Sequence, residues 1–257
     1  MRRRKVIFFL CLVFGLGIMN YPFVRQFLNR QTQRSLVTSY KESVEQMEEE
    51  EILAKKQAYQ EYNEALRHDK QATLDLHEQM LGVIHIPKID VMLPVYYQTS
   101  QDVLNKGVGI VEGMSIPIGG EGTHAVLMAH SGLPTQTLFT DLDQLALGDT
   151  FEIDILDEKL YYEVVQIEIV EPHELEQLSI DMNQDQVTLV TCTPYGLNTH
   201  RLLVIARRTA APLESETSLG WYALEKAIFA ISIVVLITAI FMLWKPFKKE
   251  RRHDRVI

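Results

Sequence analysis

Three side chains that could carry out acyl transfer together stand at the ends of predicted strands. Cys192 and His130 each end an apolar run, directly before a segment of turn-forming residues. Arg201 opens the apolar run that follows Cys192. If these last two runs pair as an antiparallel hairpin, the start of one strand lies beside the end of the other. The guanidinium of Arg201 then falls close to the thiol.

These three groups have complementary chemistry. A thiolate at Cys192 can attack a carbonyl, and an imidazolium at His130 can protonate the leaving amine. A guanidinium at Arg201 can stabilise the oxyanion. Each residue alone also has an ordinary structural explanation: a buried cysteine, a hydrogen-bonded core or turn histidine, and a surface ion pair. The residue types alone leave both interpretations open.

The composition limits the classes of function. Hydrophobic residues make up 47% of the 257 residues and charged residues 23%, which is typical of a packed globular chain. The only cysteines are Cys11 and Cys192, so we expect neither a disulfide framework nor a cysteine-based zinc site, and no cofactor. A net charge of −9 argues against nucleic acid as a partner.

Both ends of the chain carry signals for a membrane. Residues 2–5 are basic, 6–19 are apolar, and the following Asn-Tyr-Pro-Phe lacks the small-x-small pattern that signal peptidase requires, so residues 1–24 are predicted as an uncleaved signal anchor. Cleavage is the alternative. Residues 227–244 contain no charge and precede a basic tail, 245–257, which predicts a transmembrane helix over 223–244 rather than a buried core helix. The positive-inside rule then places both termini in the cytoplasm and the rest of the chain outside the cell, anchored to the lipid bilayer.

The segment between the membrane signals is strongly acidic. Leaving out residues 1–5 and 223–257 removes 11 basic and 3 acidic residues, which leaves 14 basic and 31 acidic residues and a net charge of −17. Such a segment favours cationic partners such as lysine-bearing proteins, although a solvated surface explains the charge equally well.

The pattern of residue types changes at residue 80. Residues 25–79 contain no Gly or Pro and are predicted as a helical spacer, whereas 80–210 are rich in short apolar runs separated by turn residues. We expect eight strands that form a closed antiparallel barrel rather than a sandwich, with a linker over 211–222. Short helices are expected near 102–106, 138–142 and 173–178. The eight runs are 81–86, 91–97, 106–113, 123–130, 149–156, 160–170, 186–192 and 200–208.

The motifs around the three residues resemble the signature of sortases. Thr-Leu-Val-Thr-Cys at 188–192, Arg201 nine residues later and His-Ser-Gly-Leu-Pro at 130–134 are similar to the family's TLxTC motif, following Arg and upstream His. The stretches 138–145 and 193–204 resemble the pilus-building class C branch in particular. The resemblance covers residues 80–210 and implies a mainly β, eight-stranded sortase barrel with short helices, preceded by a helical segment and flanked by membrane segments.

The resemblance also implies an activity. A membrane-anchored cysteine transpeptidase of Gram-positive bacteria would cleave an LPXTG-like sorting signal between Thr and Gly, with Cys192 as nucleophile, His130 as acid/base and Arg201 at the oxyanion or substrate. A lysine amine of a pilin subunit would accept the acyl group. Thr191, Leu133 and His173 are expected to contact substrate.

Two other functions remain open at this point. The first is a housekeeping or accessory sortase that anchors surface proteins to the cell wall, and the second is a membrane-tethered binding domain with an inert thiol. One departure from class C sortases also matters: residues 59–80 lack the Asp-Pro-aromatic motif of the family's lid. We therefore expect an open active site, and lid autoinhibition is not carried over.

Overall fold

The structure, a computed structural model, describes residues 2–68, 72–74, 76, 79–133, 136–211, 230, 233–235, 237–238 and 241. The chain divides into two compact units, Met1–Leu28 with Leu219–Ile257, and Asn29–Ser218. Most of the predicted transmembrane helix 223–244, the linker from 212 and the basic tail 245–257 lie outside the described residues. The described positions between 230 and 241 are helical.

The first helix contains the apolar segment of the predicted anchor. Helix α1 (Arg2–Glu45) includes, within Cys11–Glu45, a stretch that is long and apolar enough to cross a membrane, with a mean hydropathy of 1.2. Large apolar side chains such as Phe14 and Ile18 are exposed along it. These features support an N-terminal membrane helix.

The predicted spacer is helical only in part. After a short break, helix α2 (Glu49–Leu66) follows α1 and ends well before residue 79. Its first turn holds three glutamates, Glu49, Glu50 and Glu51, which interact favourably with the positive end of the helix dipole. These three glutamates therefore form the N-terminal turn of α2.

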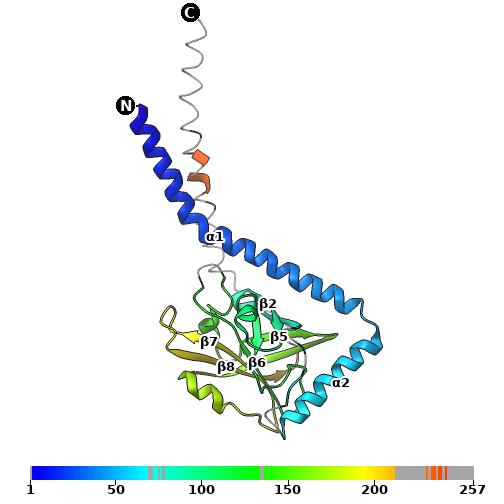
Figure 1. Cartoon of the computed structure of the whole chain (residues 1–257). Helices are drawn as coiled ribbons and strands as arrows, with labels where there is room; N and C mark the ends of the chain where they lie inside the picture. Colours follow the sequence, from blue (N-terminus) through cyan, green and yellow to red (C-terminus); the bar gives the residue numbers. More distant parts are fainter. Residues whose placement is uncertain are drawn as a thin grey trace, which may run out of the picture. The chain divides into compact units, whose positions relative to one another are not determined.

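All eight predicted strands are present, and they close into a barrel in the order β1-β2-β3-β4-β7-β8-β6-β5. Figure 1 shows the barrel with strands β2, β5, β6, β7 and β8 labelled. The predicted barrel is confirmed. The strands are β1 (Met80–Ile86), β2 (Val91–Tyr96), β3 (Val108–Ile110), β4 (Thr123–Met128), β5 (Thr150–Ile155), β6 (Glu158–Val170), β7 (Asp185–Thr193) and β8 (His200–Thr209).

The expectation that the barrel is antiparallel throughout is wrong. Strand β2 pairs with β3 in parallel, and β4 pairs with β7 in parallel. Both pairs are joined by long connections that cross over to bring the chain back in the same direction, whereas a short hairpin turn can only make antiparallel neighbours. The crossover between β2 and β3 contains the short helix α3 (Gln101–Leu104).

Three other short helices are present; the last two lie close to predicted positions, and the first was not predicted. They are 3-10 helices: η1 (Pro87–Ile89), η2 (Leu142–Gln144) and η3 (Pro172–Gln177). Helices α3 and η3 overlap the predicted segments 102–106 and 173–178. Residues 138–141 form turns, and the helix predicted over 138–142 begins only at Leu142.

The sheet has apolar side chains on both faces, as two buried clusters show. The barrel interior holds most of the core, including Leu127, Leu189 and Val204. A second, smaller cluster is formed by alternate residues of the same strands, and it lies on the outer face of β4, β7 and β8. Its buried members are Met114, Val126, Val190 and Leu203.

Helix α2 is fixed to the barrel by a buried side chain. Asn63, which is 3% exposed, donates from Nδ2 to the Ile116 carbonyl (2.9 Å), and its Oδ1 accepts from the Ile116 N–H (2.8 Å). Arg67 donates to the carbonyls of Glu121 and Gly122. The end of α2 is therefore docked on the loop before β4.

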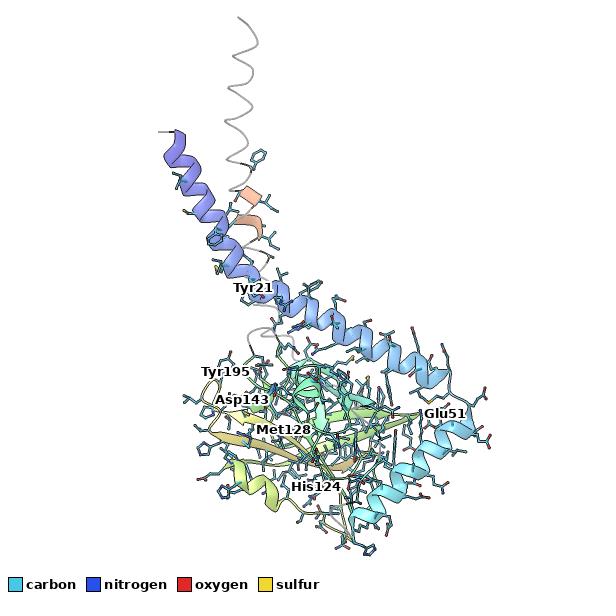
Figure 2. All side chains as sticks on the ribbon, in the orientation of Figure 1. Tyr21, Glu51, His124, Met128, Asp143 and Tyr195 are labelled. Atoms are coloured by element: carbon cyan, nitrogen blue, oxygen red, sulfur yellow. The ribbon has the colours of Figure 1, made fainter. Side chains whose placement is uncertain are left out.

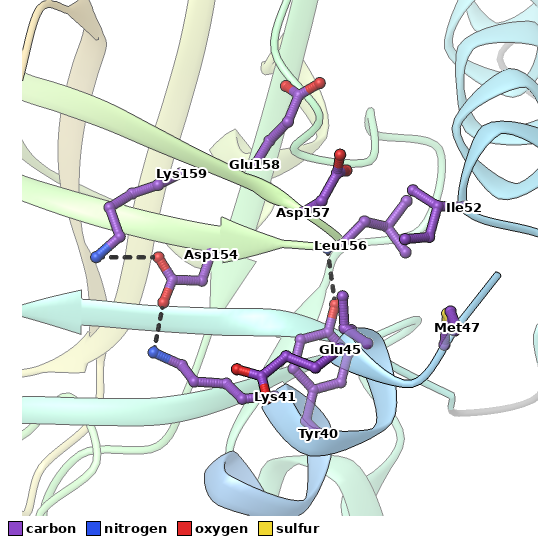
Figure 3. Close-up of a pocket in the computed structure, with 11 residues that line it drawn as sticks. Tyr40, Lys41, Glu45, Met47, Ile52, Asp154, Leu156, Asp157, Glu158 and Lys159 are labelled. Carbon is purple, nitrogen blue, oxygen red and sulfur yellow. Dashed lines mark hydrogen bonds and ion pairs between the residues drawn. The ribbon is translucent and has the colours of Figure 1, made fainter. Parts of the chain in front are cut away.

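The end of α1 is fixed to the hairpin between β5 and β6 (Figure 3). The Tyr40 hydroxyl accepts from the Leu156 N–H at 2.9 Å and donates to the carbonyl of Leu81. Lys41 Nζ lies 2.8 Å from Asp154 Oδ2. A pocket of about 410 Å³ lies between these elements, and none of its lining residues comes from β4, β7 or β8.

Candidate active site

The register of three neighbouring strands brings the predicted catalytic residues into one row. Cys192 on β7 pairs directly with Arg201 on β8. Strand β4 pairs with β7 in parallel, with Met128 opposite Val190. Two residues further along both strands, His130 therefore falls beside Cys192. The order across the sheet is His130, Cys192, Arg201.

The side chains of Cys192 and Arg201 project from the outer face of the barrel, and His130 follows the end of β4. Side chains alternate along a strand, so Cys192 shares its face with Val190, and Arg201 shares its face with Leu203. Both apolar residues belong to the outer cluster. Cys192 and Arg201 thus lie next to the apolar pair Val190 and Leu203 on the same face. Two residues along a strand correspond to a separation of about 7 Å.

The outer face is an apolar floor with apolar neighbours around it. Partly buried side chains pack against the outer cluster from several segments. Met128, labelled in Figure 2 at the end of β4, is one of them. The others are Val111 after β3, Val170 at the end of β6 and Leu178 after η3. These neighbours cover the cluster, because its four buried members are at most 8% exposed.

Two hydroxyl groups hold the ends of β4 and β7 together. Ser131 Oγ donates to the Cys192 carbonyl at 2.6 Å. Thr191 Oγ1 donates to the Ala129 carbonyl at 2.9 Å and is 3% exposed. Each link lies one residue from a member of the catalytic row. They therefore fix the spacing of the histidine and the cysteine.

His130 is partly buried at the edge of the row. Burial lowers the pKa of its imidazole below the ordinary value of 6.5, because desolvation disfavours the charged form. Its Nε2 lies 3.3 Å from Nε2 of Gln101, the first residue of α3, and its carbonyl accepts from the Phe139 N–H at 3.1 Å. Helix α3 and the turn before η2 thus flank the histidine.

Arg201 and Cys192 are both partly exposed. The guanidinium donates from Nη1 to the carbonyls of His200 (3.0 Å) and Asn198 (3.3 Å). In the described structure, no hydrogen bond joins the side chains of the three catalytic candidates to one another. Their proximity comes from strand register, and the guanidinium still has donors available for a substrate.

The three predicted substrate contacts lie in different environments. The Thr191 hydroxyl points to the opposite face from Cys192, where it bonds to the backbone of β4. Leu133 packs partly buried against the interior core. His173 is exposed, with Nδ1 3.4 Å from Glu171 Oε2. None of these contacts links them to the catalytic row, and their role toward a substrate stays a prediction.

The segment in the position of the class C lid packs away from the thiol. Ala72, Leu74 and Leu76 pack partly buried against the interior core, and the Leu74 N–H donates to the Tyr97 hydroxyl at 3.2 Å. Among the described residues of 68–79, none has a hydrogen bond to the catalytic row. Cys192 is partly exposed, and the open active site stays a prediction.

Sequence reasoning missed several residues that support the row. Ser131 directly follows His130, the candidate catalytic histidine, so its place in the motif was a signal that could have identified it. Gln101 lies about thirty residues upstream and has no such signal. His124 and Thr188 form a buried pair on the outer face, at 2.8 Å between Nε2 and Oγ1.

Comparisons with known proteins agree with this fold. Residues 84–209 match the sortase domain. The solved structure of Clostridium perfringens sortase C with its C-terminal cell wall sorting motif is 46% identical, covers 69% of this chain and 99% of that chain, and has a TM-score of 0.65. Sortase C1 of pilus island 1 from group B Streptococcus is 36% identical, with 72% and 97% coverage and a TM-score of 0.66.

Sortase D of Bacillus subtilis (strain 168) is 29% identical over 118 residues, which are 46% of this chain and 57% of that protein. The match thus spans little more than half the length of this relative. The chain belongs to the sortase family, a family of cysteine transpeptidases, and its structural neighbours are class C sortases.

Proposed function

We propose that this chain is a class C sortase that joins pilin subunits. It cleaves an LPXTG-like sorting signal between Thr and Gly and transfers the acyl group to a lysine amine of a pilin. The observation that carries the proposal is the row His130, Cys192, Arg201 across three adjacent strands. The printed association of one structural neighbour with a pilus island supports the pilin acceptor.

The reaction follows from the position of each group. The Cys192 thiol gives up its proton to His130, and the thiolate attacks the carbonyl carbon of the Thr residue. Arg201, opposite Cys192 in the register, donates to the oxygen that becomes negative. His130 then protonates the amine of the leaving Gly, and a thioester remains on Cys192.

The second half of the reaction reverses these roles. A lysine amine attacks the thioester carbon, and neutral His130 accepts the proton that the amine loses. The Cys192 thiolate then leaves, and an amide bond joins the two proteins. The lowered pKa of His130 supports this step, because it increases the share of neutral imidazole at neutral pH.

We also propose that the catalytic unit acts outside the cell while the chain is held in the membrane. The apolar stretch of α1 supports an N-terminal anchor. The basic residues beyond both apolar runs support cytoplasmic termini. The excess of acidic residues between the runs suits an acceptor that presents a lysine.

A competition between acceptors tests the proposal. The full chain in detergent is given an LPXTG-type peptide with equal concentrations of a lysine-bearing pilin peptide and a peptide that imitates the cell-wall amine. Mass spectrometry of the products should show an amide to the lysine side chain. A predominant product with the cell-wall amine would instead indicate a housekeeping or accessory sortase.

The alternative of an inert binding domain gives a different result. A binding domain would yield neither product, and hydroxylamine would release no cleaved peptide. Cys192→Ala would then leave peptide binding unchanged and alter stability only. Cleavage that disappears in this variant excludes the binding domain.

A further inference from the structure

The second half of strand β6 has a neighbouring strand on one side only. Strand β5 pairs with β6 over Glu158–Glu163, and the loop before β5 bonds to the backbone of Val164. Beyond Val164, β6 pairs with β8 as far as Val170. Within the part of the chain that the structure describes, residues 165–170 make no backbone hydrogen bond on their other side. These residues form an open edge, at which alternate N–H and C=O groups face solvent.

The side chains of the open edge are exposed and alternate in character. Ile167 and Ile169 pair with residues of the interior core on β8, but are themselves 37% and 64% exposed. On the other face, Gln166 donates from Nε2 to Glu168 Oε1 at 2.6 Å. An exposed edge with apolar side chains is a template on which a further strand can pair.

The charge around the open edge indicates which kind of strand fits. Residues 160–186 contain seven acidic residues and no Lys or Arg. Glu168 on the edge and Glu171 directly after it are both exposed. A second copy of the chain would bring two such acidic segments together, which is unfavourable. A strand that places basic side chains beside Glu168 is attracted instead.

The open edge ends at the catalytic row. Val170, its last residue, pairs with Arg201, and Arg201 pairs with Cys192. Neighbouring strands are about 4.8 Å apart, so a strand added beside Val170 lies about 14 Å from Cys192. About three or four extended residues beyond the end of that strand, together with a Lys side chain, span this distance. A protein bound at the edge can therefore present a lysine to the thiol.

We propose that the open edge of β6 binds an extended segment of the acceptor protein by strand addition. Backbone hydrogen bonds to residues 165–170 hold this segment. Its apolar side chains extend the row of Ile167 and Ile169, and its basic side chains lie beside Glu168. The acceptor lysine follows the segment and reaches the thioester on Cys192. The inference rests on the proposed function, because it requires transfer to a lysine amine.

A pair of synthetic acceptors tests the inference with the full chain in detergent. The first peptide is a short run of alternating Val and Arg residues, with a Lys after a Gly-Ser-Gly spacer at each end and an acetylated N-terminus. The second has the same composition with Val and Arg in consecutive pairs, so it cannot place all its Val side chains on one face of a strand. We expect the KM of the wild type to be about tenfold lower for the alternating peptide.

Substitutions on the open edge should affect only the second half of the reaction. Ile169→Lys and Glu168→Lys should each raise the KM for the alternating peptide about fivefold, because each replaces a favourable cross-strand contact by repulsion. Cleavage of an LPXTG-type peptide with hydroxylamine as the acceptor should stay within about twofold of wild type, because hydroxylamine needs no docking site. Glu61→Lys makes the same charge change on the exposed face of α2 and should alter neither value.

Hydrogen exchange measures strand addition without turnover. In the full-length Cys192→Ala variant, a saturating concentration of the alternating peptide should slow amide exchange within residues 165–170 about tenfold. The peptide with paired Val and Arg should leave this exchange unchanged. The slowing should also disappear when Ile169→Lys is added.

The outcomes separate the inference from the proposed function. A wild-type chain that does not cleave the LPXTG-type peptide defeats the proposed function. An active wild type with equal KM for the two acceptors, and with unchanged exchange at 165–170, overturns the docking site alone. Slower exchange at higher chain concentration without peptide would assign the edge to a second copy and would also overturn the inference. If Ile169→Lys loses its cooperative unfolding transition, Glu168→Lys decides by the same criteria.

Discussion

The bond from Ser131 to the Cys192 carbonyl should be needed for the geometry of the catalytic row. Ser131 is 8% exposed, and its Oγ lies 2.6 Å from the carbonyl oxygen. The substitution Ser131→Ala removes the donor and leaves the acceptor without it. Because this end of β7 is partly exposed, the unpaired carbonyl should lower the free energy of unfolding by about 1–2 kcal/mol, the lower part of the usual range.

This free energy should be visible in two measurements. For a folded unit of this size, about 1–2 kcal/mol lowers Tm by about 2–8 °C. If the transition state requires the same fixed spacing of His130 and Cys192, kcat/KM falls by about five- to thirtyfold. Thermal unfolding and peptide cleavage, measured on the same preparation, give both numbers.

Two variants serve as controls for Ser131→Ala. Ser131→Thr keeps the hydroxyl and should retain most of the activity. Ser43→Ala removes a hydroxyl that donates to the Tyr40 carbonyl on the exposed side of α1, and should change stability by no more than about 0.5 kcal/mol. If Ser131→Ala has the Tm and kcat/KM of the wild type, strand pairing alone fixes the row and our reasoning is refuted.

Further predictions concern the oxyanion, pH and the docking of α2. Arg201→Lys should lower kcat roughly a hundredfold to a thousandfold, because an ammonium lacks the planar pair of donors, and near wild-type turnover would exclude this role. Burial lowers the pKa of His124, so below about pH 6.5 the unfolded chain binds a proton that the folded chain does not. The contribution of His124 to the free energy of unfolding should therefore be present above that pH and decrease as the pH falls. Urea unfolding should show a smaller pH dependence in His124→Gln. Asn63→Ala leaves the buried N–H and carbonyl of Ile116 unpaired and should cost about 2–5 kcal/mol in urea unfolding, while Gln57→Ala on the exposed face of α2 should cost less than about 0.5 kcal/mol.

The strands and the positions of the catalytic candidates could be predicted from local sequence. Apolar runs bounded by Gly, Pro and Asn define each strand, and Cys192 and His130 stand where such runs end. The hairpin argument placed Arg201 opposite Cys192 correctly, because consecutive antiparallel strands with a short connection have few alternatives.

Contacts between distant segments could not be predicted in this way. The parallel pairing of β4 and β7 depends on how a long connection crosses the barrel, and apolar runs have no direction. Asn63 lies in the predicted helical spacer, yet its side chain is buried and bonded to Ile116, 53 residues away. The bond between His124 and the Ser179 carbonyl joins residues 55 positions apart, and no local pattern indicates it.

Intact-mass analysis of the chain after addition of an LPXTG-type peptide tests the central claim most directly. We predict a single adduct with the mass of the peptide acylated through its Thr residue, located on Cys192 and released by hydroxylamine. Cys192→Ala should form none, although Cys11 is still present. An adduct that persists in Cys192→Ala, or a wild-type chain that forms no adduct while the peptide is cleaved, would contradict the account.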